Sequence, residues 1–178
     1  MQYKQIDGVI VCIRCDDGNV QFLPRFEDAS LDDRIPWEQT DKEYVRLPDF
    51  SAFVDIASPQ YLEVRKGEKL ANLGRSFNER IAGTIDAHDY RMQFDISDSL
   101  KMQGAIQLLE ATGATEGYLT LANDETVYHV PLEIMKAVLV DMLASYAACH
   151  ARKQELRAAI KAAETVDDLE KVVITWPI

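Results

Sequence analysis

Residues 131–164 read PLEIMKAVLVDMLASYAACHARKQELRAAIKAAE, and this stretch decides the fold. Its apolar side chains recur at intervals of three and four, which predicts one long amphipathic helix. Pro131 suits the first helical position, because its missing N–H would be unpaired there in any case. A continuous helix from Pro131 to Glu164 would span about 50 Å at roughly 1.5 Å per residue.

The inward positions of this helix form two rows at heptad spacing, which we call the inner seam. One row consists of Leu132, Leu139, Tyr146, Lys153 and Ile160, and the other of Met135, Met142, Cys149, Leu156 and Ala163. Only Lys153 breaks its apolar character. Intrachain burial is the usual fate of such a face, here against a predicted helix at 98–111 and a short C-terminal helix. A coiled coil between copies of the chain is the alternative, which the sequence leaves open.

The residues after the long helix predict a short helix followed by a strand. Thr165 is placed to cap a helix over 166–171, whose first turn contains two aspartates. Residues 172–176 favour a strand, and Pro177 is expected to end it.

Upstream of the long helix, helical and strand patterns alternate. The expected elements are a helix over 59–83, short strands at 84–86 and 90–95, a helix capped by Ser97 and ended by Gly113, and a hairpin with strands at 117–121 and 126–130.

The N-terminal part reads as β structure followed by an arm. Strands at 2–6, 9–14 and 19–23 predict a β-meander, because Asp7-Gly8 between apolar runs suits a tight hairpin turn. Residues 25–60 show no sustained period, apart from a short strand around 44–47, and predict an irregular arm. The arm either wraps its own domain or docks on a partner through its aromatic side chains.

The fold class is therefore α+β: a small N-terminal β-meander, central mixed strands and helices, and a C-terminal long helix with a short helix and a strand. Two parts are expected, a β-rich region with its arm at 1–58 and an α+β domain at 59–178. The residues that could bind a partner are aromatic side chains of the arm and apolar ones of the last third: Trp37, Tyr44, Phe50, Phe53, Leu132, Leu139, Met142, Tyr146 and Trp176.

Composition narrows the classes of partner. The chain has 178 residues, 47% of them hydrophobic, so it can bury a core. Its net charge of −11 repels phosphate backbones and anionic lipid, so we expect protein partners rather than nucleic acid or a membrane. No stretch approaches the roughly 18 apolar residues of a membrane helix, and the first residues lack the apolar core of a signal peptide. The three cysteines, an odd number, are expected to be free thiols.

Two cysteine motifs are weak candidates for metal or redox chemistry. Cys12-Ile-Arg-Cys15 has a zinc-like spacing, but no second pair follows it, and strand residues three apart point to opposite faces. In Cys149-His150, the cysteine is expected to pack in the inner seam and the histidine to lie at its solvent-exposed edge.

The turn Asp86-Ala-His88-Asp89 could hold a metal or orient an imidazole, and a small metal-dependent hydrolase is the alternative function that it would support. Polar residues are, however, ordinary at turns. The sequence has no nucleophile elbow, phosphate loop, dinucleotide fingerprint or His-Glu-x-x-His helix. We therefore expect no enzyme, no cofactor and no metal site.

A family resemblance covers roughly residues 80–178. The motifs that carry it are Tyr90-Arg-Met-Gln-Phe-Asp95, Ile106-Gln-Leu-Leu109, Leu119-Thr-Leu-Ala-Asn-Asp-Glu-Thr-Val127, Gln154-Glu-Leu-Arg-Ala-Ala-Ile160, Ala162-Ala-Glu-Thr-Val166 and Ile174-Thr-Trp-Pro177. In their order and residues these motifs resemble a domain of unknown function common at the C-terminus of bacteriophage tail proteins. The closing Trp176-Pro177 is also similar to the ending of phage tail-fibre assembly chaperones.

The resemblance implies a structural or assembly protein of a phage tail. It would bind the tail fibre or the baseplate as an adapter, or else act as a transient chaperone of the fibre that is not retained in the virion. An adapter would be made in the host cytoplasm and end in the virion tail. No active site comes with the resemblance.

Overall fold

The computed structural model describes residues 1–30 and 32–177. The chain divides into two compact units: the first holds residues 1–67 and 164–167, and the second holds 68–163 and the residues from Asp168 onward. Helices and antiparallel strands occur together, with a long helix near the C-terminus, so the predicted α+β class is confirmed.

The first unit contains the predicted meander. Its four-stranded antiparallel sheet has the order β3-β2-β1-β4, with β1 Gln2–Ile6, β2 Val9–Arg14, β3 Val20–Phe22 and β4 Glu38–Gln39. Asp7 and Gly8 join β1 to β2 with φ values of 51° and 78°, as the turn residues predicted. The arm starts with the 3₁₀ segment η1, Pro24–Ser30, and contributes a hairpin of β5 Tyr44–Arg46 and β6 Phe53–Asp55.

A bulge in β2 gives this sheet two apolar faces. Lys4 pairs with Cys12 and Gln5 with Ile10, so Val11 is the extra residue. Val11 and Cys12 consequently belong to one buried cluster, whereas Ile10 and Ile13 belong to another. The arm supplies residues to both clusters, so within this unit it wraps its own domain, which was one of the two expectations for it.

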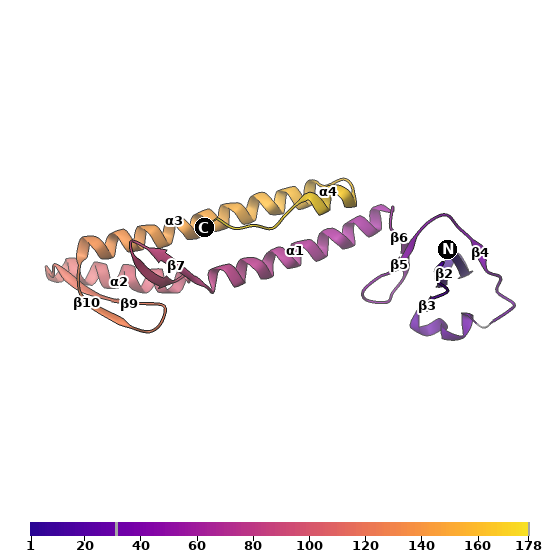
Figure 1. Cartoon of the computed structure of the whole chain (residues 1–178), viewed down its shortest axis with the longest axis horizontal. Helices are drawn as coiled ribbons and strands as arrows, with labels where there is room; N and C mark the ends of the chain where they lie inside the picture. Colours follow the sequence, from indigo (N-terminus) through magenta and orange to yellow (C-terminus); the bar gives the residue numbers. More distant parts are fainter. Residues whose placement is uncertain (31, 178) are drawn as a thin grey trace. The chain divides into compact units, whose positions relative to one another are not determined.

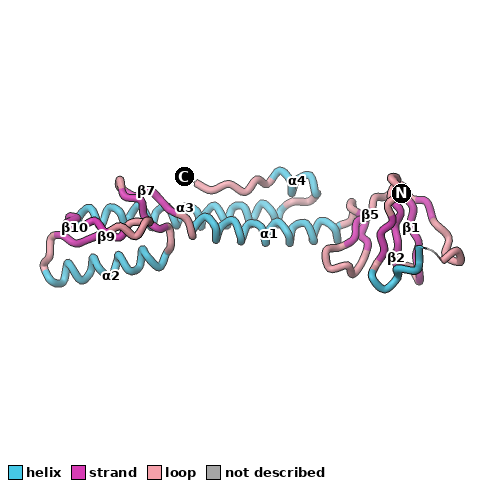
Figure 2. Tube along the Cα trace, turned by 60° about the horizontal axis from the view of Figure 1, so that its bottom comes forward, coloured by secondary structure: helices cyan, strands magenta, loops and turns pink. Residues whose placement is uncertain are grey.

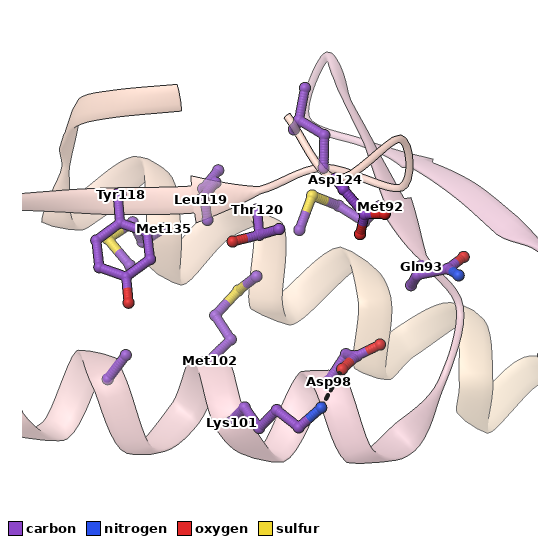
Figure 3. A pocket seen from close by; sticks show the side chains of 12 residues that line it. Met92, Gln93, Asp98, Lys101, Met102, Tyr118, Leu119, Thr120, Asp124 and Met135 are labelled. Atoms are coloured by element: carbon purple, nitrogen blue, oxygen red, sulfur yellow. Dashed lines mark hydrogen bonds and ion pairs between the residues drawn. The ribbon is translucent and has the colours of Figure 1, made fainter. Parts of the chain in front are cut away.

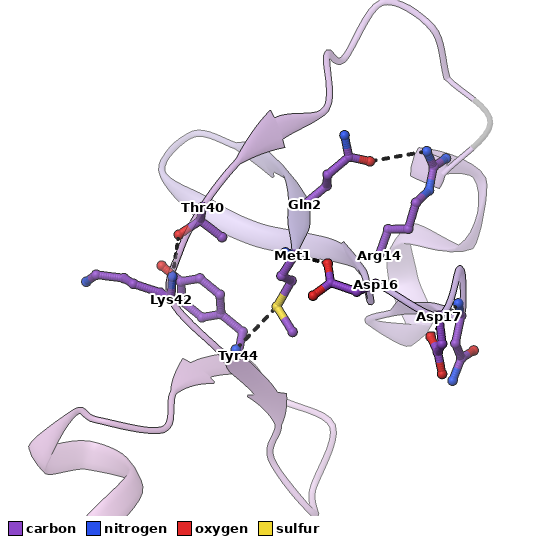
Figure 4. A network of polar contacts seen from close by, with 9 residues as sticks. Met1, Gln2, Arg14, Asp16, Asp17, Thr40, Lys42 and Tyr44 are labelled. Carbon is purple, nitrogen blue, oxygen red and sulfur yellow. Dashed lines mark hydrogen bonds and ion pairs between the residues drawn. The ribbon is translucent and has the colours of Figure 1, made fainter.

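Polar contacts tie the arm to the first strand (Figure 4). The backbone N–H of Tyr44 donates to the sulfur of Met1 at 3.4 Å, and the amino group of Met1 pairs with Asp16 at 2.8 Å. In the neighbouring strand β4, Glu38 accepts hydrogen bonds from the Tyr3 hydroxyl and the Gln5 amide. The hydrogen bond from Tyr3 is the largest influence that holds the pKa of Glu38 below its usual value.

The second unit is built around α3, Leu132–Ala162, the long helix. Its other elements are the part of α1 (Pro59–Ile81) from Glu68 onward, β7 Thr84–Ala87, β8 Tyr90–Gln93, α2 Ile96–Thr112, β9 Glu116–Thr120, β10 Thr126–Pro131 and the end of α4, Val166–Lys171. Two antiparallel hairpins, β7–β8 and β9–β10, lie beside the helices. Figures 1 and 2 show α2 alongside the first half of α3, and the part of α1 from Glu68 onward alongside its second half.

Three details of the prediction are wrong. The cap of α2 is Asp95 rather than Ser97: the Asp95 backbone is extended, and its carboxylate accepts the N–H of Ser97 at 2.7 Å. Helix α3 begins at Leu132, because Pro131 keeps a ψ of 140° and pairs with Glu116 as the last residue of β10.

The third error is the C-terminal strand. Residues 172–177 form no strand, because side-chain contacts rather than a backbone ladder hold this segment. The indole N–H of Trp176 donates to the Ser76 hydroxyl at 2.8 Å, and Arg152 reaches the carbonyl of Thr175 at 3.4 Å. Figure 1 shows the segment returning along α3 from α4.

Candidate partner-binding surface

A hollow in the second unit lies between α2, β8 and the β9–β10 hairpin. Its volume is about 310 Å³. Figure 3 shows Met102 extending from α2 and Tyr118 extending from β9 toward that helix. The residues that line it are Met92, Gln93, Asp98, Lys101, Met102, Ala105, Tyr118, Leu119, Thr120, Leu121, Asp124 and Met135.

Close packing at Gly117 positions β9 above α2 and α3. A Cβ at this residue would lie 2.7 Å from Leu109 Cδ1 and 2.9 Å from Met135 Sδ, so only glycine fits without movement of these side chains. The hairpin also contains a bulge, because Tyr128 pairs with Tyr118 but Val130 pairs with Gly117. The bulged residue between them has a φ of 57°.

Methionines give the hollow its chemical character. Met92, Met102 and Met135 come from a strand and two helices, and their thioethers converge on one space. Methionine is flexible and polarisable, so a surface lined by it can adapt to apolar or aromatic side chains of different shapes. An ion pair lies at the edge formed by α2, where Lys101 Nζ is 2.7 Å from Asp98 Oδ1, and the pKa of Lys101 is raised by that hydrogen bond.

Two tyrosines extend the apolar surface across the hairpin. Tyr118 and Tyr128 are direct cross-strand partners, with ring centroids 6.3 Å apart, and are 60% and 69% exposed. Leu100 and Leu108 on α2 are exposed as well. Tyrosine is enriched in protein interfaces, since it buries a large apolar area and keeps a hydroxyl for hydrogen bonding. Together with the methionine hollow, these two tyrosines form what we call the hairpin surface.

The arm residues predicted to bind a partner have different surroundings. Phe53 is buried, and Tyr44 packs in the same cluster, with its ring 5.9 Å from that of Tyr3. The Trp37 ring has Arg14 at 4.1 Å and the buried Lys4 at 4.8 Å from its centroid. Phe50 is exposed, under the guanidinium of Arg46. Among these four aromatics, Phe50 offers the most accessible ring.

The inner seam of α3 is covered by the same chain, as its intrachain alternative predicted. Met142 is 1% exposed in a cluster that Leu132 and Leu139 join from its edge, with α2 and both hairpins around them. Further along, Tyr146 and Trp176 surround Phe77 with centroid distances of 6.3 and 5.6 Å. The seam is therefore not available to a second copy in this structure.

Lys153, the one charge in the seam, has an aromatic partner. Its Nζ lies 4.0 Å from the centroid of the Phe77 ring. The ring face attracts the cation, and the aliphatic stem of the lysine continues the apolar seam.

The candidate chemical groups lie apart from one another. Cys12 is buried and Cys15 half-buried in different clusters, which agrees with opposite strand faces. Burial raises the pKa of the Cys12 thiol and also that of Cys149, which keeps both protonated at neutral pH. Within residues 1–30 and 32–177, no group of three or more His, Cys, Asp and Glu side chains is arranged to hold a metal ion.

At the hairpin tip between β7 and β8, Asp86, His88 and Asp89 are exposed, whereas Ala87 is buried. His88 and Asp89 have φ values of 47° and 70°, which are the backbone angles that such a turn requires. Asp86 pairs across the hairpin with Arg91.

Tyr118, Tyr128, Met92 and Met102 were not among the residues predicted to bind a partner, and Met135 was predicted only as part of the inner seam. For the tyrosines a signal was available, because Tyr118 and Tyr128 are equally distant from the Asn123 turn and so face each other in a simple hairpin. No comparable signal was available for Met92 and Met102, whose meeting depends on how a strand and a helix pack.

In the part of the chain that the structure describes, no helix combines the length and apolar character needed to cross a membrane.

Comparisons with known proteins identify the family of this chain. Neither a curated protein nor a solved structure matches the chain. A family model described as "Domain of unknown function (DUF4376)" matches residues 64–174, which is more than half of the sequence. The chain belongs to the DUF4376 family.

Proposed function

We propose that this chain is a structural or assembly protein of a bacteriophage tail, which binds the tail fibre or the baseplate as an adapter. Its phage context is supported by the resemblance of residues 80–178 to the domain found in phage tail proteins. Its mode of action is binding rather than catalysis, and its expected location is the virion tail. The observation that carries the binding role is the hairpin surface, an exposed tyrosine pair beside a methionine-lined hollow.

The geometry suits an apolar or aromatic side chain of a protein partner. Such a side chain would enter the hollow between Met102 and Met135 and lie against the ring of Tyr118. At its edge, the exposed Lys101 and the half-buried Asp98 can replace their mutual ion pair with contacts to polar groups of the partner, as at the rim of an interface. Burial of two exposed tyrosines would supply much of the binding energy, since aromatic anchors dominate interfaces of standard size.

The second unit would use this surface for one partner, while the first unit offers its own exposed groups. Phe50 is 47% exposed, and Val9 is 49% exposed. An adapter needs two such surfaces on separately folded parts, and the acidic charge of the chain favours basic partner surfaces.

Capture of the fibre and baseplate proteins by the purified full chain tests the surface. A Tyr118→Thr/Tyr128→Thr double variant should bind at least about ten-fold more weakly, because truncation of central interface tyrosines costs more than about 1.4 kcal/mol. Val173→Thr is the matched control, since Val173 is 65% exposed but lies in the C-terminal segment. Equal binding by the double variant and the control would show that the hairpin surface is not the interface.

Mass spectrometry of purified virions separates adapter from chaperone. An adapter is retained in the tail at a fixed ratio to the fibre or baseplate protein. Absence from virions, together with misfolded fibres when the gene is deleted, would instead identify the transient chaperone. Absence from virions with normal fibres and tails would overturn both assignments.

A further inference from the structure

The outer face of α3 carries a second apolar heptad series. Ala137, Val140, Ala144, Ala147 and Ala151 follow one another at alternating intervals of three and four, on the side of the helix away from Met135 and Met142. Val140 is 63% exposed, and Leu143 beside it is 37% exposed. We call this row, with Leu143 and Ala148 at its flanks, the outer seam.

We propose that the outer seam pairs with the outer seam of a second copy of this chain, in a parallel two-helix coil. Alanines at four of the five core positions let two helix backbones approach closely, and Val140 adds a larger apolar contact in the first turns. The pairing concerns the second unit alone, and it does not depend on the proposed phage function.

Charge complementarity favours the parallel orientation. In a parallel two-helix coil, the residue just before a core position lies opposite the partner residue whose number is higher by about five. Lys136 precedes the core residue Ala137, so it lies opposite Asp141 of the second copy. An antiparallel pair centred on the same residues would bring Lys136 against Arg157 instead. Lys136 already contacts Glu110 and Glu133 of its own chain at 2.9 and 3.0 Å, so the new pair contributes orientation more than affinity.

The surface also offers a knob and a hole that match in this orientation. A hollow of about 260 Å³ is lined by Ala144, Ser145, Ala148 and Pro177. In the parallel pair, Leu143 of the second copy lies opposite Ala148, at the mouth of this hollow. The same contact forms twice by symmetry, so each protomer supplies one leucine and receives one.

The interface is small, and the dimer should be correspondingly weak. The outer seam extends over about 20 Å of helix at roughly 1.5 Å per residue. Two helices in contact over that length bury less than the roughly 1,200 Å² of a standard stable interface. We therefore expect a dissociation constant on the order of micromolar or higher. A tail particle would favour the dimer by holding copies close together, which raises their effective concentration.

Sedimentation of the pure full-length chain over a range of concentrations tests the pairing. The wild type should shift from monomer to dimer, and Ala147→Glu should raise the dissociation constant at least about ten-fold by placing two carboxylates in the contact. The matched control is Ala159→Glu, an exposed alanine of the same helix about 100° away from the seam. Its dissociation constant should stay within about two-fold of the wild-type value, with unchanged helical content in both variants.

A disulfide tests the orientation. Ala151→Cys, in a Cys15→Ser background, should form a disulfide-linked dimer, because a parallel pair brings the two Cα atoms of residue 151 within the roughly 4.4–6.8 Å that a disulfide requires. An antiparallel pair would hold them about 16 Å apart along the axis. A wild type that remains monomeric at every concentration, or a control variant as impaired as Ala147→Glu, overturns the dimer; a dimer without the disulfide overturns its parallel orientation.

Discussion

The two faces of α3 have similar apolar heptad patterns and opposite surroundings. On the inner face, Met135, Val138 and Met142 are at most 1% exposed, whereas Val140 on the outer face is 63% exposed. The difference arises because α2 and both hairpins cover only one side of the helix. The comparison teaches that periodicity identifies an apolar face, but the available partners decide which face becomes core.

The inner face itself changes character along the helix. Its first half packs in a cluster rich in methionine and aliphatic residues. Its second half carries Tyr146 and Lys153, which both lie against the ring of Phe77, and Trp176 packs on the same ring. The two halves should consequently respond differently to substitution.

Paired substitutions on the two faces should give the largest contrast. Met142→Ala should lower the free energy of unfolding by about 2–5 kcal/mol, because it leaves a cavity in the core. Val140→Ala should change it by no more than about 0.5 kcal/mol, because the side chain is exposed. Chemical denaturation followed by circular dichroism measures both. Equal losses would contradict the assignment of inner and outer faces.

Trp176→Ala should have the next largest effect, since it removes the contact that holds the C-terminal segment to α1. The ring of Trp176 packs on Phe77, and its indole N–H donates to Ser76. The free energy of unfolding should fall by about 2 kcal/mol, because the substitution removes a half-buried tryptophan and its one hydrogen bond. Val173→Ala, in the same segment but exposed, serves as the control, and a comparable loss in that variant would show that the segment contributes without a specific role for the indole.

The N-cap of α2 should contribute about 1 kcal/mol to the free energy of unfolding. Asp95→Ala removes the acceptor for the Ser97 N–H, and thermal denaturation should detect the loss. That backbone hydrogen bond is also the main reason why the pKa of Asp95 is lowered in the folded chain. The stabilisation is therefore complete above the ordinary aspartate pKa of about 3.9 and is lost as the pH falls through the lower folded value.

Asp95→Asn provides the control for this pH dependence, because asparagine caps a helix without titrating. Wild type and Asp95→Asn should differ least at the lowest pH at which both remain folded. A wild-type advantage that grows as the pH falls below about 4 would contradict the sign of this linkage.

Replacement of Lys153 should give the smallest effect. Lys153→Gln retains much of the aliphatic side chain but removes the charge above Phe77, so the free energy of unfolding should fall by about 0.5–1 kcal/mol. Arg157→Gln, at an exposed position one turn further along α3, is the control and should stay within about 0.5 kcal/mol of wild type. If the two variants lose the same stability, the cation–aromatic contact has no separate role.

Most secondary structure could be predicted because local signals were strong. Asp7-Gly8 and Gly113 occupy positions with positive φ, as turn and helix-end chemistry required. The errors occurred where two local signals competed, since Asp95 and Ser97 can both cap a helix and Pro131 suits both a strand end and a first helical turn. The prediction of a C-terminal strand failed for another reason, because residues 172–177 are held by side chains of distant residues.

The hairpin surface likewise combines one feature that local sequence predicts with one that depends on tertiary packing. The tyrosine pair follows from hairpin symmetry, which is local. The methionine hollow depends on three elements that meet only after packing, so no short window of sequence contains it.

By itself, the sequence determined the α+β class, the long helix and its apolar rows, because periodicity and turn chemistry act over a few residues. Only the tertiary structure decided which row is buried, that Lys153 lies over an aromatic ring, and that Trp176 holds the C-terminal segment against α1. These features depend on contacts between residues up to 100 positions apart. Such contacts are selected by how whole faces fit together, and local pattern carries no record of that fit.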